Sequence, residues 1–195
     1  MNLIRKAWTC WALAIPSVLS LPSQAAGLAG HKTISLVTPA GDKVVIGHVD
    51  FSSKEAGYAF KLSFKRGAFK EIYMQETNFL CLITPGKEVC HFPYPPGDYK
   101  PDDSSGFISE SDLRGLEYAL LFVEKRPAPA EVDLNPFNGL YYPLNIVAGH
   151  IEGTPFAVDL KRAIIAGADS KYPIGKGDLD PLDAASQRFP RLLIE

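Results

Sequence analysis

The sequence has little cysteine and histidine, and it lacks the short motifs of the common hydrolases and nucleotide-binding enzymes. Of its 195 residues, three are cysteine and four are histidine. Neither the Gly-x-Ser-x-Gly nucleophile elbow nor a Ser-x-x-Lys pair occurs. His-Glu-x-x-His and glycine-rich phosphate loops are absent as well. The sequence therefore favours a protein that is not an enzyme, and it predicts no cofactor.

An excess of positive charge is also lacking. The chain has 20 Lys and Arg against 22 Asp and Glu, a formal net charge of −2. A mildly acidic protein has no electrostatic attraction for nucleic acid or for an anionic membrane surface. We expect no nucleic-acid partner.

The longest apolar run lies at the N-terminus and is too short to span a membrane. Arg5 and Lys6 precede a mostly apolar stretch from Ala7 to Leu21, which Pro16 interrupts. A membrane-spanning helix needs about 20 consecutive apolar residues. A basic start followed by a short apolar run is instead typical of a signal peptide.

Small residues at the end of this run predict where the signal peptide is removed. Ser23 and Ala25 stand at the −3 and −1 positions that signal peptidase reads, and a cut after Ala26 is the second choice. We predict a cleaved segment 1–25 and a single domain, 26–195, of net charge −4, since removal leaves 18 basic against 22 acidic residues. No second segment could span a membrane, so we expect no stable membrane insertion after processing.

Cysteine usage agrees with export. Cys10 leaves with the signal peptide, so Cys81 and Cys90 remain as an even pair, as in an oxidising compartment. No Asn-x-Ser/Thr glycosylation site occurs, which favours a bacterial envelope over a eukaryotic secretory route. The periplasm is the first choice of location, and the medium is the second.

A predicted hairpin brings these two cysteines together. Segments 78–83 and 88–92 flank a turn at Thr84–Lys87. Counting outward from the turn places Cys81 opposite Cys90, as a non-hydrogen-bonded pair with Cα atoms about 4.5 Å apart. That separation allows a disulfide.

Most of the remaining sequence predicts strands. The aromatic and aliphatic residues of 58–64 alternate with small or cationic ones, which predicts a strand with one buried face. Further strands are expected at 33–37, 43–51, 68–75, 116–125, 140–147 and 151–158. Two short helices are predicted near the C-terminus, at 159–166 and 180–189, because Asp159 and Asp180 can cap them. The expected fold is mainly β, a sandwich or partly open antiparallel barrel with two short C-terminal helices.

Two His-x-acid pairs suggest a metal site. His48 and Asp50 share one face of a strand, as do His150 and Glu152. If the two strands were neighbours, the four side chains would converge as ligands for zinc or a similar ion. This arrangement predicts a metal-dependent hydrolase as the alternative function, and a polar strand face in water is the other interpretation.

The proline-rich loop 91–99 suggests a contact surface instead. Phe92, Tyr94 and Tyr99 stand among prolines, and stiff aromatic loops lose little entropy when they bind. The other interpretation is a rigid connection whose rings pack on the sheet. We predict an exported β-rich binding or structural domain of the cell envelope, with an envelope protein or a saccharide as partner.

Overall fold

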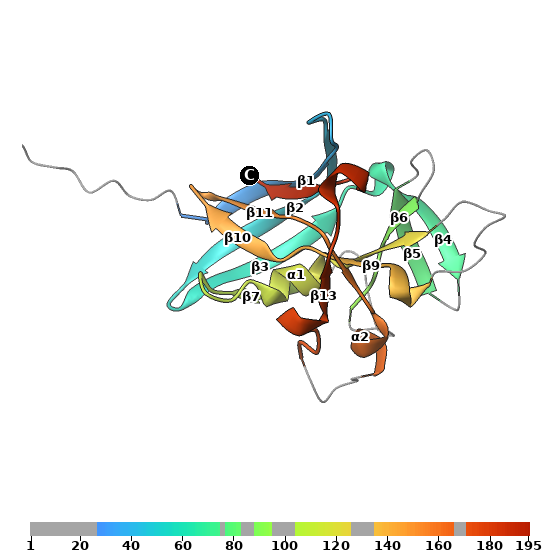
Figure 1. Cartoon of the computed structure of the whole chain (residues 1–195). Helices are drawn as coiled ribbons and strands as arrows, with labels where there is room; N and C mark the ends of the chain where they lie inside the picture. The colour runs from blue at the N-terminus through green and yellow to red at the C-terminus, as the bar shows by residue number, and fades with distance from the viewer. Residues whose placement is uncertain (1–26, 75–76, 83–87, 95–103, 126–134, 166–170) are drawn as a thin grey trace, which may run out of the picture.

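The protein is built from two antiparallel β-sheets (Figure 1). The computed structural model describes residues 27–74, 77–82, 88–94, 104–125, 135–165 and 171–195. The predicted signal peptide, the turn Thr84–Lys87 and Tyr99 lie outside the described residues.

Sheet A is the half-barrel on the left of Figure 1. Its seven strands, in spatial order, are β10 (Leu144–Val147), β11 (His150–Gly153), β14 (Arg191–Ile194), β1 (Gly30–Val37), β2 (Lys43–Lys54), β3 (Gly57–Phe64) and β7 (Ser104–Ile108). Sheet B, also seven-stranded, runs β13 (Leu179–Pro181), β12 (Phe156–Val158), β9 (Gly139–Tyr141), β8 (Phe122–Lys125), β6 (Glu88–His91), β5 (Thr77–Leu82) and β4 (Lys70–Met74). The mainly β prediction is confirmed.

Residue alternation explains how the strands of sheet A bury one face. In β3, Phe60, Leu62 and Phe64 are buried, whereas Lys61 and Ser63 between them are exposed. This period of two confirms the predicted strand at 58–64 and its inward face.

Two predicted strands are each divided between the sheets. Segment 140–147 forms β9 in sheet B and then β10 in sheet A, and segment 151–158 forms β11 in sheet A and then β12 in sheet B. Pro143 and Pro155 stand at the two crossings. Proline has no N–H to donate to a ladder, so each strand ends there and the chain passes to the other sheet.

The predicted helices are only partly present. Helix α2 (Lys161–Ile165) begins after Asp159, whose carboxylate accepts the Lys161 N–H at 2.9 Å. The predicted helix at 180–189 is wrong, because β13 and a 3₁₀ turn at Ala184–Ser186 occupy that segment. The buried Phe189 draws the following chain into the core as it enters β14.

The second helix lies in the middle of the chain, where a strand was predicted. Helix α1 (Arg114–Ala119) precedes β8, so 116–125 is half helix and half strand. Leu113, Leu116 and Leu120 follow helical spacing and are buried in the core of the half-barrel. An uninterrupted apolar run does not distinguish helix from strand by periodicity. Further 3₁₀ turns among the described residues are Arg66–Ala68, Pro136–Asn138 and Lys176–Asp178.

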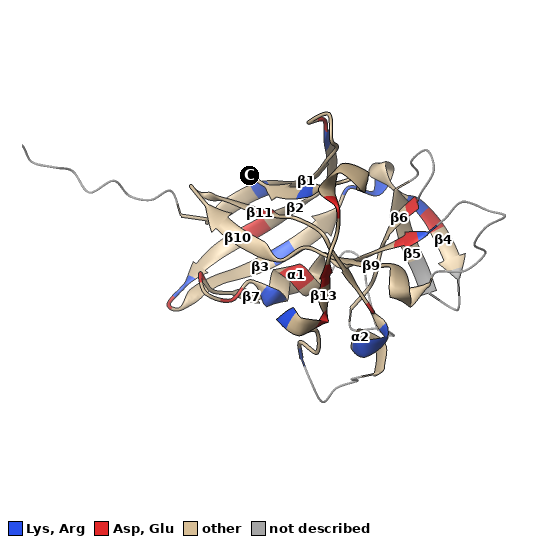
Figure 2. Cartoon of the chain, in the orientation of Figure 1, with Lys and Arg blue, Asp and Glu red and all other residues tan. Residues whose placement is uncertain are grey.

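Sheet B separates two hydrophobic cores. Leu80, Val89 and Leu140 face the half-barrel, while their strand neighbours Cys81 and Cys90 face a second core beside α2. The central strands of sheet B are therefore covered on both faces, so β9 and the start of β8 bury consecutive residues. No helix within the described ranges is long and apolar enough to cross a membrane. Figure 2 shows that acidic and basic residues are interspersed along the strands of both sheets.

Candidate binding site

The four predicted metal ligands do not come together. His48 and Asp50 lie on β2, His150 and Glu152 lie on β11, and β14 and β1 stand between these strands. With neighbouring strands about 4.8 Å apart, the two pairs are about 14 Å apart. In the part of the chain that the structure describes, no three His, Cys, Asp or Glu residues form a group that could hold a metal ion. The structure therefore places the four predicted ligands as two separate pairs, on β2 and on β11.

Each pair takes part in separate surface contacts. The His31 ring on β1 stacks on His48 with centroids 4.8 Å apart, and its Nδ1 lies 2.8 Å from Asp50 Oδ1. His150 lies 3.7 Å from Glu152 on β11. These contacts are half-buried or exposed. They agree with the alternative interpretation of the two pairs, a polar strand face in water.

Two of the three rings of the predicted aromatic contact surface are described: Phe92 is buried and Tyr94 is half-buried. Phe92 is only 8% exposed and belongs to the second core. Tyr94 packs against Tyr118, with ring centroids 4.8 Å apart, and donates a hydrogen bond to the Lys171 carbonyl at 3.3 Å. These two rings attach the described start of this segment, 92–94, to the second core, because burial of aromatic area is favourable. The outcome for Tyr99 lies outside the described residues.

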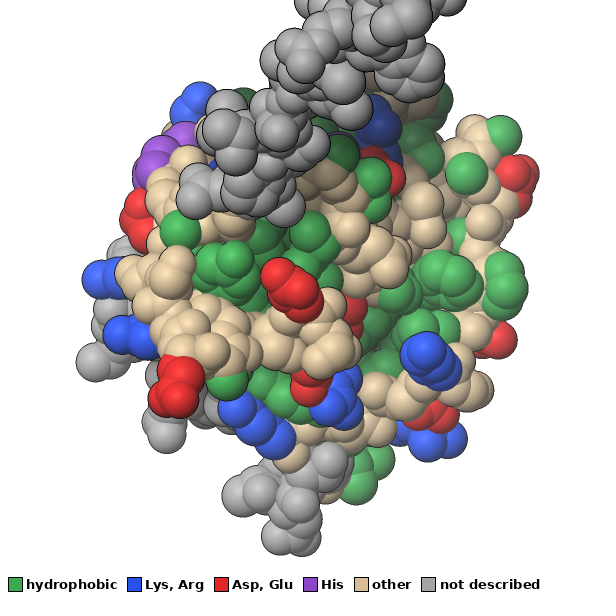
Figure 3. Space-filling model, turned by 90° about the vertical axis from the view of Figure 1, so that its left-hand side faces the viewer, with side chains coloured by type: hydrophobic (Ala, Val, Ile, Leu, Met, Phe, Trp, Pro, Cys, Tyr) green, Lys and Arg blue, Asp and Glu red, His purple; other side chains and the backbone are tan. Residues whose placement is uncertain are grey.

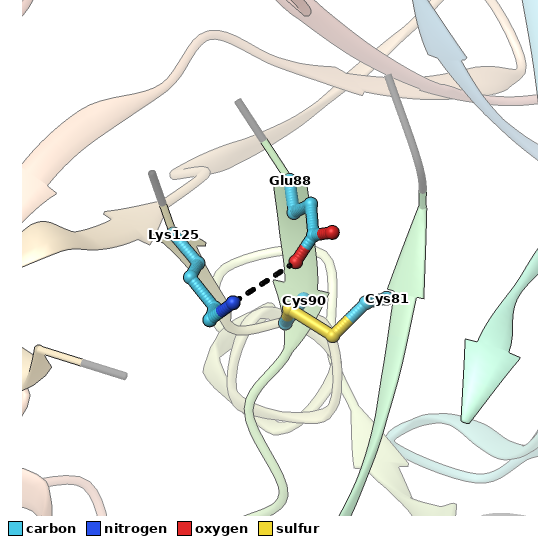
Figure 4. Close-up of a disulfide and its surroundings, with 4 residues drawn as sticks. All are labelled: Cys81, Glu88, Cys90 and Lys125. Carbon is cyan, nitrogen blue, oxygen red and sulfur yellow. Dashed lines mark hydrogen bonds and ion pairs between the residues drawn. A yellow bond between two sulfur atoms is a disulfide. The ribbon is translucent and has the colours of Figure 1, made fainter. Parts of the chain in front are cut away.

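Cys81 and Cys90 form a disulfide, drawn in Figure 4. They are directly opposite in the β5–β6 ladder, as the hairpin register predicted, and their Cα atoms are 3.9 Å apart. Both residues are fully buried in the second core. Nearby, Lys125 Nζ on β8 lies 3.4 Å from Glu88 Oε2 on β6. A disulfide is consistent with an oxidising, extracellular location.

A pocket of about 910 Å³ occupies the opening of the half-barrel. One wall is the segment from the end of β7 into α1, the second is β10, and the third is the chain leading to β13. The lining residues are Glu110, Ser111, Asp112, Leu113, Arg114, Glu117, Tyr141, Pro143, Leu144, Asn145, Ile146, Ile174, Gly175, Lys176 and Leu179. Ligand pockets range from about 300 to 1,000 Å³, so this one has room for a ligand.

Glu117 of α1 is the buried polar group of this pocket. It is 8% exposed, and both of its carboxylate oxygens accept hydrogen bonds. The Tyr141 hydroxyl donates to Oε2, and the Leu144 backbone N–H donates to Oε1 at 2.8 Å. Burial raises the pKa of Glu117, and the bonds from Tyr141 and Leu144 oppose that rise. The carboxylate is thus a fixed acceptor whose orientation its neighbours set.

The β10–β11 hairpin explains why the Leu144 N–H points toward α1. Val147 pairs with His150 across a two-residue turn, Ala148–Gly149, in which both residues have positive φ. Residues flanking such a turn form a hydrogen-bonded pair, and bonded and non-bonded positions then alternate. Leu144 and Ile146 therefore direct their backbone groups away from β11. Glu117 Oε1 takes the place that a carbonyl of the next strand would occupy.

Acidic residues outnumber basic residues in the lining of the pocket. Arg114 is held by Asp112 through two bonds, Nε–Oδ1 at 2.9 Å and Nη2–Oδ2 at 2.7 Å. The hydrogen bond from Arg114 lowers the pKa of Asp112 to about 2. This pair is neutral as a unit, which leaves two acidic residues, Glu110 and Glu117, and one further basic residue, Lys176, among the lining residues. The pocket has a small excess of negative charge.

The sequence contained no direct signal for this pocket, because its walls come from segments that are far apart in the chain. Figure 3 looks onto the side of the molecule that carries the β2–β3 and β10–β11 hairpins, and hydrophobic side chains reach the surface there between acidic and basic ones. No protein-family model, curated protein or solved structure matches the chain.

Proposed function

We propose that this chain is an exported, non-enzymatic binding protein of the cell envelope that takes a ligand into the opening of its half-barrel. The observation that carries the proposal is the pocket of about 910 Å³ with the Glu117 carboxylate held in a fixed orientation among its lining residues. A small number of placed polar groups within a partly apolar wall is typical of ligand sites. The periplasm is the preferred location, with the medium second.

Binding is favoured over the metal-dependent hydrolase, because the ligand set of the hydrolase is divided between β2 and β11. Glu117 is held from two sides, by Tyr141 and by the backbone of Leu144, so it keeps its position before a ligand arrives. A group positioned in advance loses less entropy on binding.

An NMR titration of the isotope-labelled protein tests the site with two probe sets, short peptides and oligosaccharides of defined sequence. We expect a probe to shift the backbone amides of 110–117, 144–146 and 174–179 selectively. Ser111→Trp, which adds bulk at a lining residue, should abolish these shifts. Ser105→Trp, on an exposed position of β7 away from the pocket, should retain them. Shifts that are equal in both variants, or that fall elsewhere, would contradict the proposed site.

Export is tested by N-terminal sequencing of protein recovered outside the cytoplasm. We expect the exported form to begin at Ala26, because Ser23 and Ala25 fit the peptidase positions. Recovery of a soluble chain that begins at Met1 would contradict export by a cleaved signal.

A further inference from the structure

We infer that the ligand is an extended peptide that pairs with the free edge of β10 and directs a basic side chain to Glu117. This inference rests on the proposed function, because it assigns an occupant to the same pocket. Two observations carry it: the backbone groups of β10 that point into the opening, and the unequal charge of the lining.

The first observation concerns the edge of sheet A. Within the described residues, β10 has a strand neighbour on one side only, β11. The Leu144 N–H is already bonded to Glu117, but the Ile146 N–H and C=O are directed outward by the alternation of the ladder. An extended peptide gains affinity at such an edge through main-chain hydrogen bonds, and side-chain pockets add specificity.

The opposite edge of sheet A does not offer the same site. Helix α1 packs along β7, and Gly115 approaches so closely that an added Cβ would lie 2.7 Å from the Phe107 carbonyl oxygen. The opening of the half-barrel therefore presents β10 as its exposed strand edge.

The second observation concerns charge. Asp112 and Arg114 neutralise each other, so the remaining lining charges are two negative, Glu110 and Glu117, and one positive, Lys176. Glu117 has accepted one hydrogen bond at each oxygen, and a carboxylate oxygen can accept two. An ammonium or guanidinium group would supply the remaining donors together with the opposite charge.

The apolar part of the lining fits the same side chain. Leu144, Ile146, Ile174 and Leu179 line the pocket beside the carboxylate. The methylene stem of lysine or arginine can lie along such a surface while its charged head reaches an acceptor. A saccharide fits less well, because sugar sites use open aromatic faces. Tyr141, the aromatic residue among the described lining residues, is only 4% exposed.

The test uses three pentapeptides and the protein expressed from its full sequence. The first is acetyl-Thr-Val-Lys-Val-Thr-amide, the second replaces Lys with norleucine, and the third N-methylates the backbone nitrogens of both Val residues. We expect the lysine peptide to shift the Ile146 amide and to bind about tenfold more tightly than the norleucine peptide, because it adds a charge-assisted hydrogen bond. The N-methylated peptide should not bind.

Two protein variants locate the charge. Glu117→Gln should reduce the affinity for the lysine peptide to about that for the norleucine peptide. Glu55→Gln, on the exposed β2–β3 turn, should change neither affinity. If Glu117→Gln fails to fold, the three peptides on the unaltered protein decide the question.

The outcomes separate this inference from the proposed function. Equal affinity for the lysine and norleucine peptides, or for the N-methylated peptide, would overturn the inference. If chitotriose shifts the pocket amides and no peptide does, the inference fails while the proposed function stands. If neither class of probe shifts those amides, both fail.

Discussion

The Tyr141 hydroxyl donates a buried hydrogen bond to the Glu117 carboxylate, and this contact joins sheet B to the helix that fills the half-barrel. Leu144, three residues after Tyr141, donates to the other carboxylate oxygen from sheet A. One side chain thus connects α1 to both sheets at the point where the chain crosses between them.

Tyr141→Phe should lower the free energy of unfolding by about 1–3 kcal/mol, because it removes one donor from a buried carboxylate. Urea denaturation monitored by circular dichroism measures the change. Tyr73→Phe is the matched control, since Tyr73 is 73% exposed and its loss should have little effect. Equal effects of the two substitutions would contradict a stabilising role for the Tyr141–Glu117 bond.

Deprotonation of Glu117 should lower the free energy of unfolding as pH rises. Its pKa in the folded protein is raised above the ordinary 4.5 by burial, so the folded state holds the proton more tightly than the unfolded state. The corresponding stability is fully present below pH 4.5 and is lost as pH rises through the folded pKa. As pH rises from 4.5 through the folded pKa of Glu117, the unaltered protein should therefore lose unfolding free energy relative to Glu117→Gln, whose amide does not titrate. A difference that stays constant with pH would contradict the raised pKa.

His91 should make the free energy of unfolding increase, rather than decrease, as pH rises. It is fully buried at the end of β6, its Nε2 lies 3.0 Å from the Ala119 carbonyl, and burial lowers its pKa from 6.5 to about 4. The unfolded state binds the proton more readily, so stability should rise by about 3 kcal/mol between pH 4 and 6.5. His91→Gln should remove this rise, whereas His31→Gln, at an exposed residue, should retain it. Unfolding measured across that range with all three proteins gives the result, and an unchanged slope in His91→Gln would be evidence against a buried neutral imidazole.

Opening the disulfide should lower stability by roughly 2–3 kcal/mol, as the chain-entropy model gives for a loop this short. The double variant Cys81→Ala, Cys90→Ala should have a lower melting temperature than the unaltered protein. Reducing agent should lower the melting temperature of the unaltered protein but not that of the double variant. Thiol labelling of the unreduced, denatured exported protein should detect no free thiol. Two labelled cysteines would contradict the pairing.

Gly139→Ala should destabilise the junction between β9 and β12. An added Cβ would lie 2.5 Å from Leu160 Cγ and 2.6 Å from the Val158 carbonyl oxygen. Overpacking of this kind typically lowers stability by about 1–3 kcal/mol. Gly67→Ala is the matched control, since nothing lies within 4 Å of its added Cβ. Melting temperatures that fall equally for both variants would point to loss of glycine alone rather than to this contact.

The sequence by itself determined those features that depend on residues close together in the chain. Alternation along 58–64 was sufficient to predict β3 and its buried face. The turn between two apolar runs was sufficient to pair Cys81 with Cys90, because hairpin register follows from counting outward from the turn. Both inferences use a period of two residues or a short loop, and neither requires knowledge of the distant chain.

Only the tertiary structure decided which segments meet. It made half of the apolar run 116–125 a helix, because the open side of the half-barrel must be filled. It placed β14 and β1 between β2 and β11, and so separated His48 from His150. It also brought Glu117, Tyr141 and Leu144 together at the pocket. The physical reason is that the residue pattern of one strand shows only which of its faces is apolar. Which strands become its neighbours depends on how all the apolar faces of the chain can be buried together.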